Sequence, residues 1–228
     1  MKTDNLVLAR LPRAERARLQ PHMKLVDLHF KEGIHEQGKP IDFVYFPIRG
    51  LVSVVTDLRD GGTIETGTIG REGLVGVSAV LGPSPSPGRA FVQVPGAGYR
   101  LPASKLLDHL KQGGELQTLA LKVANAQMAT VAQTAACNRA HTLEERMARW
   151  LLLTRDRMDD DEFPLTQEFL SHMLGVRRPT VSLGGATLQK AGLIRYSRGH
   201  ITIVDRKGLE QVSCECYSAI RDRYEKSL

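Results

Sequence analysis

Residues 165–194, LTQEFLSHMLGVRRPTVSLGGATLQKAGLI, decide the fold of the C-terminal part of this chain. Thr166 is a good N-cap for a short helix, and Gly175 is a natural residue to end that helix. Pro179 stands early in a second helix, where its missing N–H costs nothing, and Gly192 ends that second helix. The segment therefore predicts two helices joined by a tight turn.

The residues that follow predict a small β-hairpin. GLIRY at 192–196 and ITIV at 201–204 flank the turn SRGH at 197–200. Helix, turn, helix and a two-stranded wing together indicate a winged helix-turn-helix, in which the second helix can enter a DNA major groove. A helical hairpin with a solvated charged face is the simpler alternative.

Basic residues gather in the same part of the chain. Residues 176–207 hold seven basic residues and one acidic residue, whereas the rest of 142–228 holds seven basic and twelve acidic residues. Side chains at the start of the second helix can reach base edges and phosphates. The residues expected to contact DNA are Thr166, Gln167, Arg177, Arg178, Thr180, Ser182 and Arg198. Gly184 and Gly185 are expected to allow close packing against the preceding helix.

Composition sets limits on the whole chain. Its 228 residues, 42% hydrophobic and 25% charged, suffice for one large or two modest domains, and the net charge of +6 favours a polyanionic partner. The N-terminus lacks the apolar core of a signal peptide, and no apolar run approaches the about 20 residues of a spanning helix. We expect a cytoplasmic protein with no membrane partner.

The N-terminal half contains two successive sequence patterns, one helical and one β-rich. Residues 5–20 indicate a short amphipathic helix. From about 24 to 103, short β-rich runs alternate with turns such as DLRDGG at 57–62 and a proline-rich loop at 83–88. This pattern predicts an antiparallel sandwich or roll. The fold class is therefore α+β.

A long helix is predicted over 115–139, which contains neither glycine nor proline. Its apolar residues alternate with many alanines, so it can pack on its own domain or associate with a second copy. Thr142 and Glu145 form a capping box that begins the next helix. MDDDEF at 158–163 is expected to be a solvated acidic loop.

The whole chain resembles the Crp/Fnr family of bacterial transcription regulators. The resemblance rests on 165–194, on FKEGIHEQGKPIDFVYFPIRGLVSVV at 30–55, and on GREGLVGVSAVLG at 70–82 followed by GRAFVQV at 88–94. It implies a cyclic-nucleotide-binding-like roll over 1–112, a dimerisation helix over 113–141 and a winged helix-turn-helix with a helical tail over 142–228. It also implies a homodimer on a two-fold DNA operator, with RNA polymerase as a further partner.

The resemblance also assigns a ligand pocket, whose residues here are Gly76, Val77, Arg89, Ala90 and Val131. Cyclic-AMP-binding members have a glutamate where Val77 stands, and hydroxyl groups for the purine where Val131 and Ala132 stand. We therefore do not expect cyclic AMP to bind, and the effector is an unknown small molecule or none. Leu183 replaces a base-reading arginine of the family, so the operator should differ.

No cofactor or metal is expected from the sequence. The oxygen-sensing branch of the family needs an N-terminal cysteine cluster, but no cysteine precedes Cys137, so no such iron–sulfur cluster is expected. The three cysteines show no CxxC zinc spacing and should be reduced thiols. Cys214 and Cys216 form a CxC that is either a thiol sensor or a structural pair.

Two other classes of function are alternatives to a transcription regulator. A roll also resembles the cupin barrel of metalloenzymes, but His22, His29 and the His35-Glu36 pair never form an HxH motif, and no catalytic signature is present. We therefore do not expect an enzyme. The second alternative is a ligand-binding or protein-interaction module whose winged helix contacts protein rather than DNA.

Overall fold

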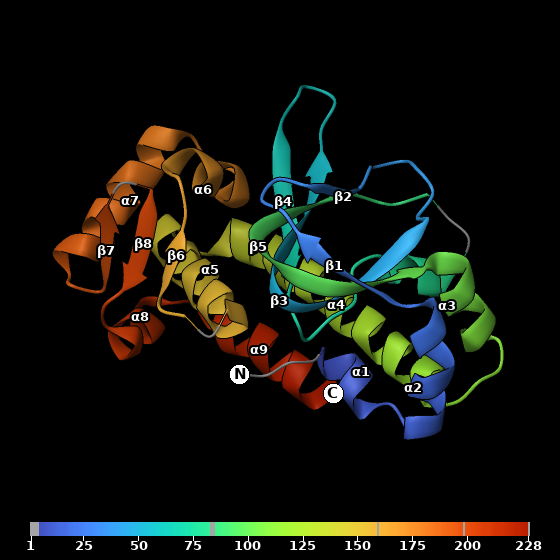
Figure 1. The fold of residues 1–228 in the computed structure, drawn as a ribbon. Helices are drawn as coiled ribbons and strands as arrows, with labels where there is room; N and C mark the ends of the chain where they lie inside the picture. The colour runs from blue at the N-terminus through green and yellow to red at the C-terminus, as the bar shows by residue number, and fades with distance from the viewer. Residues whose placement is uncertain (1–4, 83–84, 159, 198, 228) are drawn as a thin grey trace.

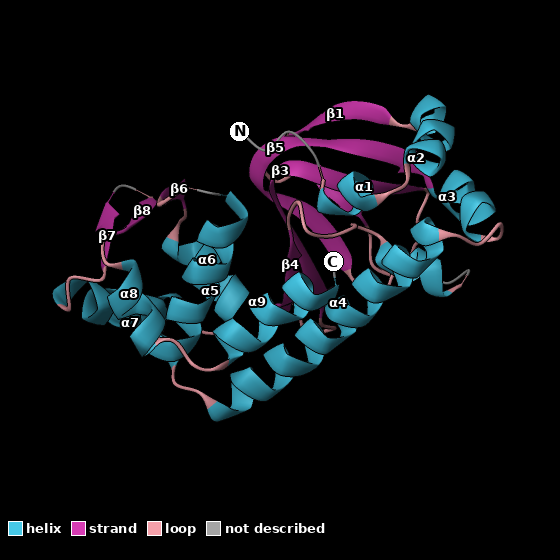
Figure 2. Cartoon of the chain, turned by 90° about the horizontal axis from the view of Figure 1, so that it is seen from below, coloured by secondary structure: helices cyan, strands magenta, loops and turns pink. Residues whose placement is uncertain are grey.

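The computed structural model describes residues 5–82, 85–158, 160–197 and 199–227. They form an N-terminal β-rich part and a C-terminal helical part (Figure 1), connected by one long helix that runs along the lower edge of the molecule in the view of Figure 2.

The N-terminal segment is two short helices rather than the single helix predicted over 5–20. α1 (Leu6–Arg10) is capped by the Asn5 side chain, which accepts from the backbone N–H groups of Val7 and Leu8. Pro12 is extended and separates α1 from α2 (Arg13–Leu19), which leads into the 3-10 turn η1 (Gln20–His22). The prediction was wrong because the apolar spacing continues across a proline that interrupts the backbone hydrogen bonding.

Five antiparallel strands form the roll, as the sequence predicts. They are β1 (Lys24–Leu28), β2 (Gly33–His35), β3 (Phe43–Asp57), β4 (Thr63–Ile69) and β5 (Arg89–Pro102). The order is β1-β5-β3-β4, and β2 also pairs with β5. The predicted turn at 57–62 joins β3 to β4, with Gly61 at φ +86°. η2 (Val77–Leu81) follows β4, and residues 83 and 84 of the predicted proline-rich loop lie outside the described residues.

Two helices follow the roll, α3 (Ala103–Leu110) and the long helix α4 (Glu115–Ala140). The apolar residues of α4 divide between two environments. Leu116, Leu119 and Val123 are buried in the core of the roll, whereas Met128 and Val131 are 62% and 40% exposed. One face of α4 therefore packs against the roll, and another carries exposed apolar side chains.

The C-terminal part begins with α5 (Leu143–Met158), whose predicted capping box is present: the Thr142 N–H donates to Glu145 Oε2 over 2.7 Å. The helix-turn-helix is α6 (Gln167–Leu174) and α7 (Arg178–Lys190). Gly175 and Gly192 end the two helices at φ +64° and +74°, as predicted.

The wing has three strands rather than the two predicted. β7 (Ile194–Ser197) pairs with β8 (His200–Ile203), and β6 (Glu162–Pro164) pairs with the other edge of β8. Residues 162 and 163, at the end of the segment predicted as an acidic loop, belong to β6. They form a strand because Phe163 is buried in the C-terminal core.

The two glycines of α7 have different surroundings. A Cβ on Gly184 would lie 3.0 Å from Leu143 Cδ2 and 3.4 Å from Met147 Cε, so Gly184 allows α7 to approach α5. The helix approached is therefore not the preceding one, α6. A Cβ on Gly185 would meet nothing within 4 Å, so close packing does not explain this glycine.

The chain ends in α8 (Arg206–Val212) and α9 (Cys216–Ser227). α9 lies beside α4 and α5, with Tyr217, Ile220 and Tyr224 buried (Figure 2). The C-terminal tail is therefore part of the packed structure. Within the described ranges, no helix is both long and apolar enough to cross a lipid bilayer.

Candidate DNA-binding surface and effector cavity

α7 presents its first turn to solvent. Arg177 is the N-cap residue, and Arg178, Pro179 and Thr180 follow it, all exposed. Leu183, one turn further along, is 69% exposed. Arg177, Arg178 and Thr180 of this surface were predicted from the sequence. Leu183 was noted only because an arginine stands at its position in other family members.

The remaining predicted DNA contacts are not all free to reach a ligand. Ser182 Oγ lies 2.7 Å from Gln167 Oε1 and donates to it, so this pair links α7 to the start of α6. Thr166 Oγ1 accepts from the Phe169 N–H over 3.1 Å and so caps α6. Arg198 lies outside the described residues.

A cavity of about 480 Å³ lies between the roll, η2 and α4. This volume is within the usual range for a site that binds a small molecule. Its described lining residues include no arginine, lysine, aspartate or glutamate. Polar groups come mainly from threonine, serine, Gln127 and His35, so the cavity is mostly apolar and uncharged.

Four of the five predicted pocket residues line this cavity: Gly76, Val77, Ala90 and Val131. Arg89 is not among the lining residues. Its Nε and Nη2 donate to the two carboxylate oxygens of Asp57 over 2.7 and 2.9 Å. The hydrogen bond from Arg89 holds the pKa of Asp57 below its ordinary value, so the pair is ionic.

Tyr224 and His35 are among the cavity residues that were not identified from the sequence. Tyr224 of α9 forms part of the wall, although it lies more than a hundred residues after β5 ends at Pro102. His35 also lines the cavity, and its Nε2 lies 2.7 Å from the Phe43 carbonyl oxygen. Burial lowers the pKa of His35 and favours the neutral ring. Nothing in the local sequence indicates either contact, because both depend on how the chain folds back.

A buried carboxyl group connects the roll to the C-terminal part. Glu65 of β4 accepts from Trp150 Nε1 of α5 over 2.7 Å, and Ser53 Oγ lies 2.8 Å from its other oxygen. Burial raises the pKa of Glu65 to about 7, against the lowering effects of Ser53, Trp150 and two arginines of α5. Glu72 and Arg157 form a second connection at 2.6 Å.

The Glu65 network favours a proton on the carboxyl group. Ser53 has one hydroxyl proton but faces two acceptors, since Gln93 Oε1 lies 2.6 Å away. If Glu65 is protonated, its O–H donates to Ser53 and Ser53 donates to Gln93. Both Glu65 oxygens, the Ser53 hydroxyl and Gln93 Oε1 then each have a hydrogen-bond partner.

The cysteines, which the sequence did not connect, come together with a histidine. Cys137, His141, Cys214 and Cys216 offer ligand atoms that all lie within 4.8 Å of one another. Nothing in the sequence indicates this arrangement, because Cys214 and Cys216 lie more than seventy residues after Cys137. The prediction that no metal binds was therefore made without it.

Two family models match the sequence. The cyclic nucleotide-binding domain matches residues 27–112, and the Crp-like helix-turn-helix domain matches residues 145–212. No curated protein matches the chain significantly.

Many solved structures share the fold. A putative transcriptional regulator of the Crp/Fnr family from Eubacterium rectale has a TM-score of 0.72 and 17% identity, covering 91% of this chain and 97% of its own. FixK2 from Bradyrhizobium japonicum has a TM-score of 0.73 and 18% identity, covering 84% and 98%. The c-di-GMP responsive global regulator CLP from Xanthomonas campestris has a TM-score of 0.69 and 14% identity, covering 84% and 99%.

A nucleotide-binding-type roll joined by a long helix to a winged helix-turn-helix defines a two-domain transcription regulator. With both domain models matched in this order, the chain belongs to the Crp/Fnr family of transcriptional regulators.

We predict that Glu65→Gln makes the free energy of unfolding less dependent on pH. The folded protein holds the Glu65 proton up to about pH 7, whereas the ordinary pKa is 4.5. The contribution of this group is therefore full below pH 4.5 and is lost as the pH rises to about 7. Glutamine keeps both hydrogen bonds of the protonated form, so the variant should gain stability relative to wild type as the pH rises.

Denaturant unfolding at a series of pH values measures this difference. Glu36→Gln, at an exposed position of the same roll, is the matched control and should follow wild type. Parallel pH curves for wild type and Glu65→Gln would contradict the assignment of a protonated Glu65.

Proposed function

We propose that this regulator binds a two-fold DNA operator as a homodimer, with α7 in the major groove, and that it does so without cyclic AMP. The observation that carries the proposal is the exposed first turn of α7, where Arg177, Arg178 and Thr180 stand free of the packed core. The N-terminal residues of a recognition helix are those that reach base edges.

Two side chains of α7 are suited to read bases directly. Arg178 can donate two parallel hydrogen bonds to O6 and N7 of a guanine. Leu183 is 69% exposed and can contact the methyl group of a thymine, which is an apolar feature of the major groove. We infer that its exposure serves this contact. Thr180 contacts the DNA backbone or a base edge, and the Ser182–Gln167 pair holds α6 and α7 in register.

A stripe on α4 supports the homodimer. Leu121, Asn125, Met128, Ala132, Ala135 and Arg139 are all exposed and are separated by alternating steps of four and three residues. This is the spacing of a coiled-coil seam, and its alanines allow two helices to approach closely. We propose that the second copy of the chain packs here.

The cavity supports independence from cyclic AMP. A bound cyclic phosphate needs a cation and the ribose hydroxyl needs an acceptor, but Arg89 is paired with Asp57 and Val77 offers no polar atom. A ribose hydroxyl left without a partner costs on the order of 1–3 kcal/mol. The uncharged lining suits a largely apolar small molecule instead.

The division of the chain into domains follows from these three proposed roles. We propose 1–112 as the sensor domain, 113–141 as the dimerisation helix and 142–228 as the DNA-binding domain with its tail. The protein acts in the cytoplasm, where DNA and RNA polymerase are its partners, and it has no catalytic residues of its own.

For DNA reading, we expect Arg178→Ala to lose about 1–3 kcal/mol of specific binding and to relax discrimination at one base pair. Leu183→Ala should weaken discrimination at a thymine. Arg195→Ala, in strand β7 of the wing, and Arg198→Ala should weaken binding to all sequences and reduce the salt slope by about one each.

Selection from a random DNA library followed by fluorescence titration at several salt concentrations measures these effects. Arg13→Ala, which removes the same charge from α2 at the far end of the molecule, is the control and should leave sequence preference unchanged (Figure 1). An Arg178→Ala variant with unaltered preference and affinity would exclude α7 as the reading helix.

For assembly, we expect wild type to be a dimer at micromolar concentration and Leu121→Glu to be a monomer. The substitution places a charge in the α4 stripe, where it would be buried by a second copy. Leu25→Glu, at a comparably exposed leucine of β1, should remain dimeric. Analytical ultracentrifugation decides the matter, and a monomeric wild type with and without DNA would refute the homodimer.

For the effector, we expect calorimetry to detect weak binding of cyclic AMP or none, and operator affinity to be the same with and without it. The physical reason is the missing acceptor at Val77 and the occupied guanidinium of Arg89. A micromolar or tighter dissociation constant, accompanied by tighter operator binding, would overturn this view of the cavity.

A further inference from the structure

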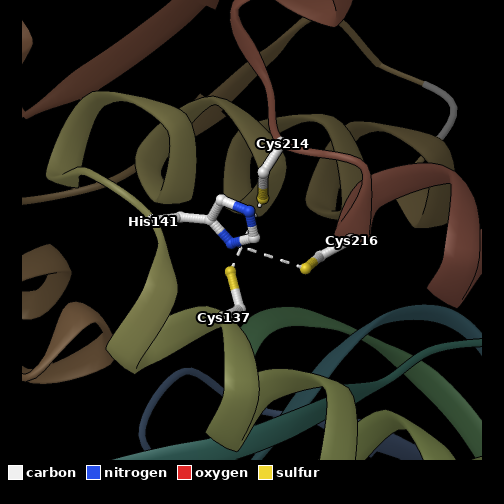
Figure 3. Close-up of side chains that lie close together, drawn as sticks. All are labelled: Cys137, His141, Cys214 and Cys216. Carbon is white, nitrogen blue, oxygen red and sulfur yellow. Dashed lines mark hydrogen bonds between the residues drawn. The ribbon is translucent and has the colours of Figure 1, made fainter.

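Four side chains from two distant segments point toward one another at the end of α4 (Figure 3). Cys137 lies in the last turn of α4, and His141 is the C-cap residue, whose backbone N–H donates to the Cys137 carbonyl oxygen. Cys214 lies in the connection between α8 and α9, and Cys216 is the first residue of α9. The three cysteines are buried and form a cluster of their own, separate from the apolar cores.

The spacing of these ligand atoms fits a single metal ion. Cys137 Sγ and Cys214 Sγ are 3.5 Å apart, and Cys216 Sγ and His141 Nδ1 are 3.7 Å apart. Sulfur and nitrogen ligands at the corners of a tetrahedron around zinc are about 3.6–3.8 Å apart, given zinc–ligand bonds of about 2.0–2.3 Å. An iron–sulfur cluster instead distributes its ligands over several iron atoms and needs a wider cage.

The histidine is held in the orientation that ligation requires. His141 Nδ1 faces the sulfurs, while Nε2 lies 3.1 Å from the carboxylate of Glu215. A metal-bound histidine commonly donates its other N–H to a carboxylate, which fixes the tautomer. Gln133 Nε2 lies 2.9 Å from Cys216 Sγ and donates to it, which favours a negatively charged sulfur.

Two arginines beside the cluster supply an independent observation. Arg149 is only 6% exposed, and its Nε, like that of Arg146, has no hydrogen-bond partner among the described residues. Both guanidinium groups interact electrostatically with Cys137. Three thiolates and one Zn²⁺ carry a net negative charge, which would offset the buried Arg149 and the partly buried Arg146. Three neutral thiols would not.

We propose that Cys137, His141, Cys214 and Cys216 bind one Zn²⁺ ion in a closed tetrahedral site. Thiolate and imidazole are ligands that zinc prefers, and four protein ligands leave no open position for catalysis. The site goes beyond the proposed function, because DNA reading requires no metal.

The location of the site gives it a structural effect. Cys137 and His141 end α4 directly before α5, where the DNA-binding part begins, and Cys216 begins α9. A bound ion therefore joins the start of the tail to the end of α4. Through α9 it also holds Tyr224, which forms part of the cavity wall.

Metal analysis of the full-length protein, purified with zinc in the growth medium, tests the proposal. We expect about one zinc per chain. After zinc removal, titration with Co²⁺ should give the visible bands of tetrahedral cobalt and the near-ultraviolet bands of thiolate ligation. Cys214→Ser and His141→Ala should lose the zinc, whereas His29→Ala, at an exposed histidine of the roll, should retain it.

Glu215→Gln separates ligation from folding. It keeps all four ligands, so the cobalt spectrum should persist, but we expect metal affinity to fall about 10–100-fold. Glu36→Gln should not change that affinity. The cobalt titration of the unaltered chain gives its answer even if Cys214→Ser does not fold.

Three results would overturn the proposal. One is a chain that holds no zinc and gives no thiolate–cobalt bands. Another is iron with inorganic sulfide, which would mean a cluster of several metal atoms. The third is a Cys137–Cys214 disulfide in protein isolated without reductant and without metal. None of these results depends on DNA binding, so failure of the metal site and failure of the proposed function are distinguishable.

Discussion

The helix α4 contacts the roll, the cavity and the cysteine cluster at successive positions along its length. The arrangement of the rest of the structure depends on these contacts. Its first half buries Leu116, Leu119 and Val123 in the core of the roll. Further along, Thr130 is buried and Met128 borders the cavity, and the last turns carry Cys137 and His141. A helix of 26 residues rises about 1.5 Å per residue, so it fixes the distances between these contacts along its axis.

Much of the fold could be predicted because its signals are local. Capping residues such as Thr166, the glycines that end α6 and α7, and the Asp-Gly turn between β3 and β4 act through the backbone within a few residues. Such signals do not depend on the remainder of the chain. The elements that were not predicted depend instead on contacts between distant parts of the chain. β6 forms because β8 offers a free edge and Phe163 has a core to enter, and neither condition is visible near residue 163.

The same distinction separates the site residues. Gly76, Val77, Ala90 and Val131 line the cavity where the family resemblance placed them, because the roll and α4 carry them there. Arg89 has the position in the sequence that the resemblance predicts. Its guanidinium group, however, donates two hydrogen bonds to Asp57 on the neighbouring strand. A residue pattern gives the position of a side chain, whereas its partner depends on the residues that surround it in space. Tyr224 and the Cys137 cluster could not be predicted for the same reason.

The place of Tyr224 bears on how freely the two halves of such a protein can be exchanged. Tyr224 of the C-terminal part contributes to the wall of a cavity in the N-terminal part, and Glu65 and Trp150 join the two parts through a buried contact. A chimaera that takes its roll from this chain and its winged helix from a relative would exchange both Tyr224 and Trp150 for the residues of that relative. The roll and the winged helix of this protein are therefore not independent modules, because side chains of the second belong to the cavity wall and to the buried contact of the first.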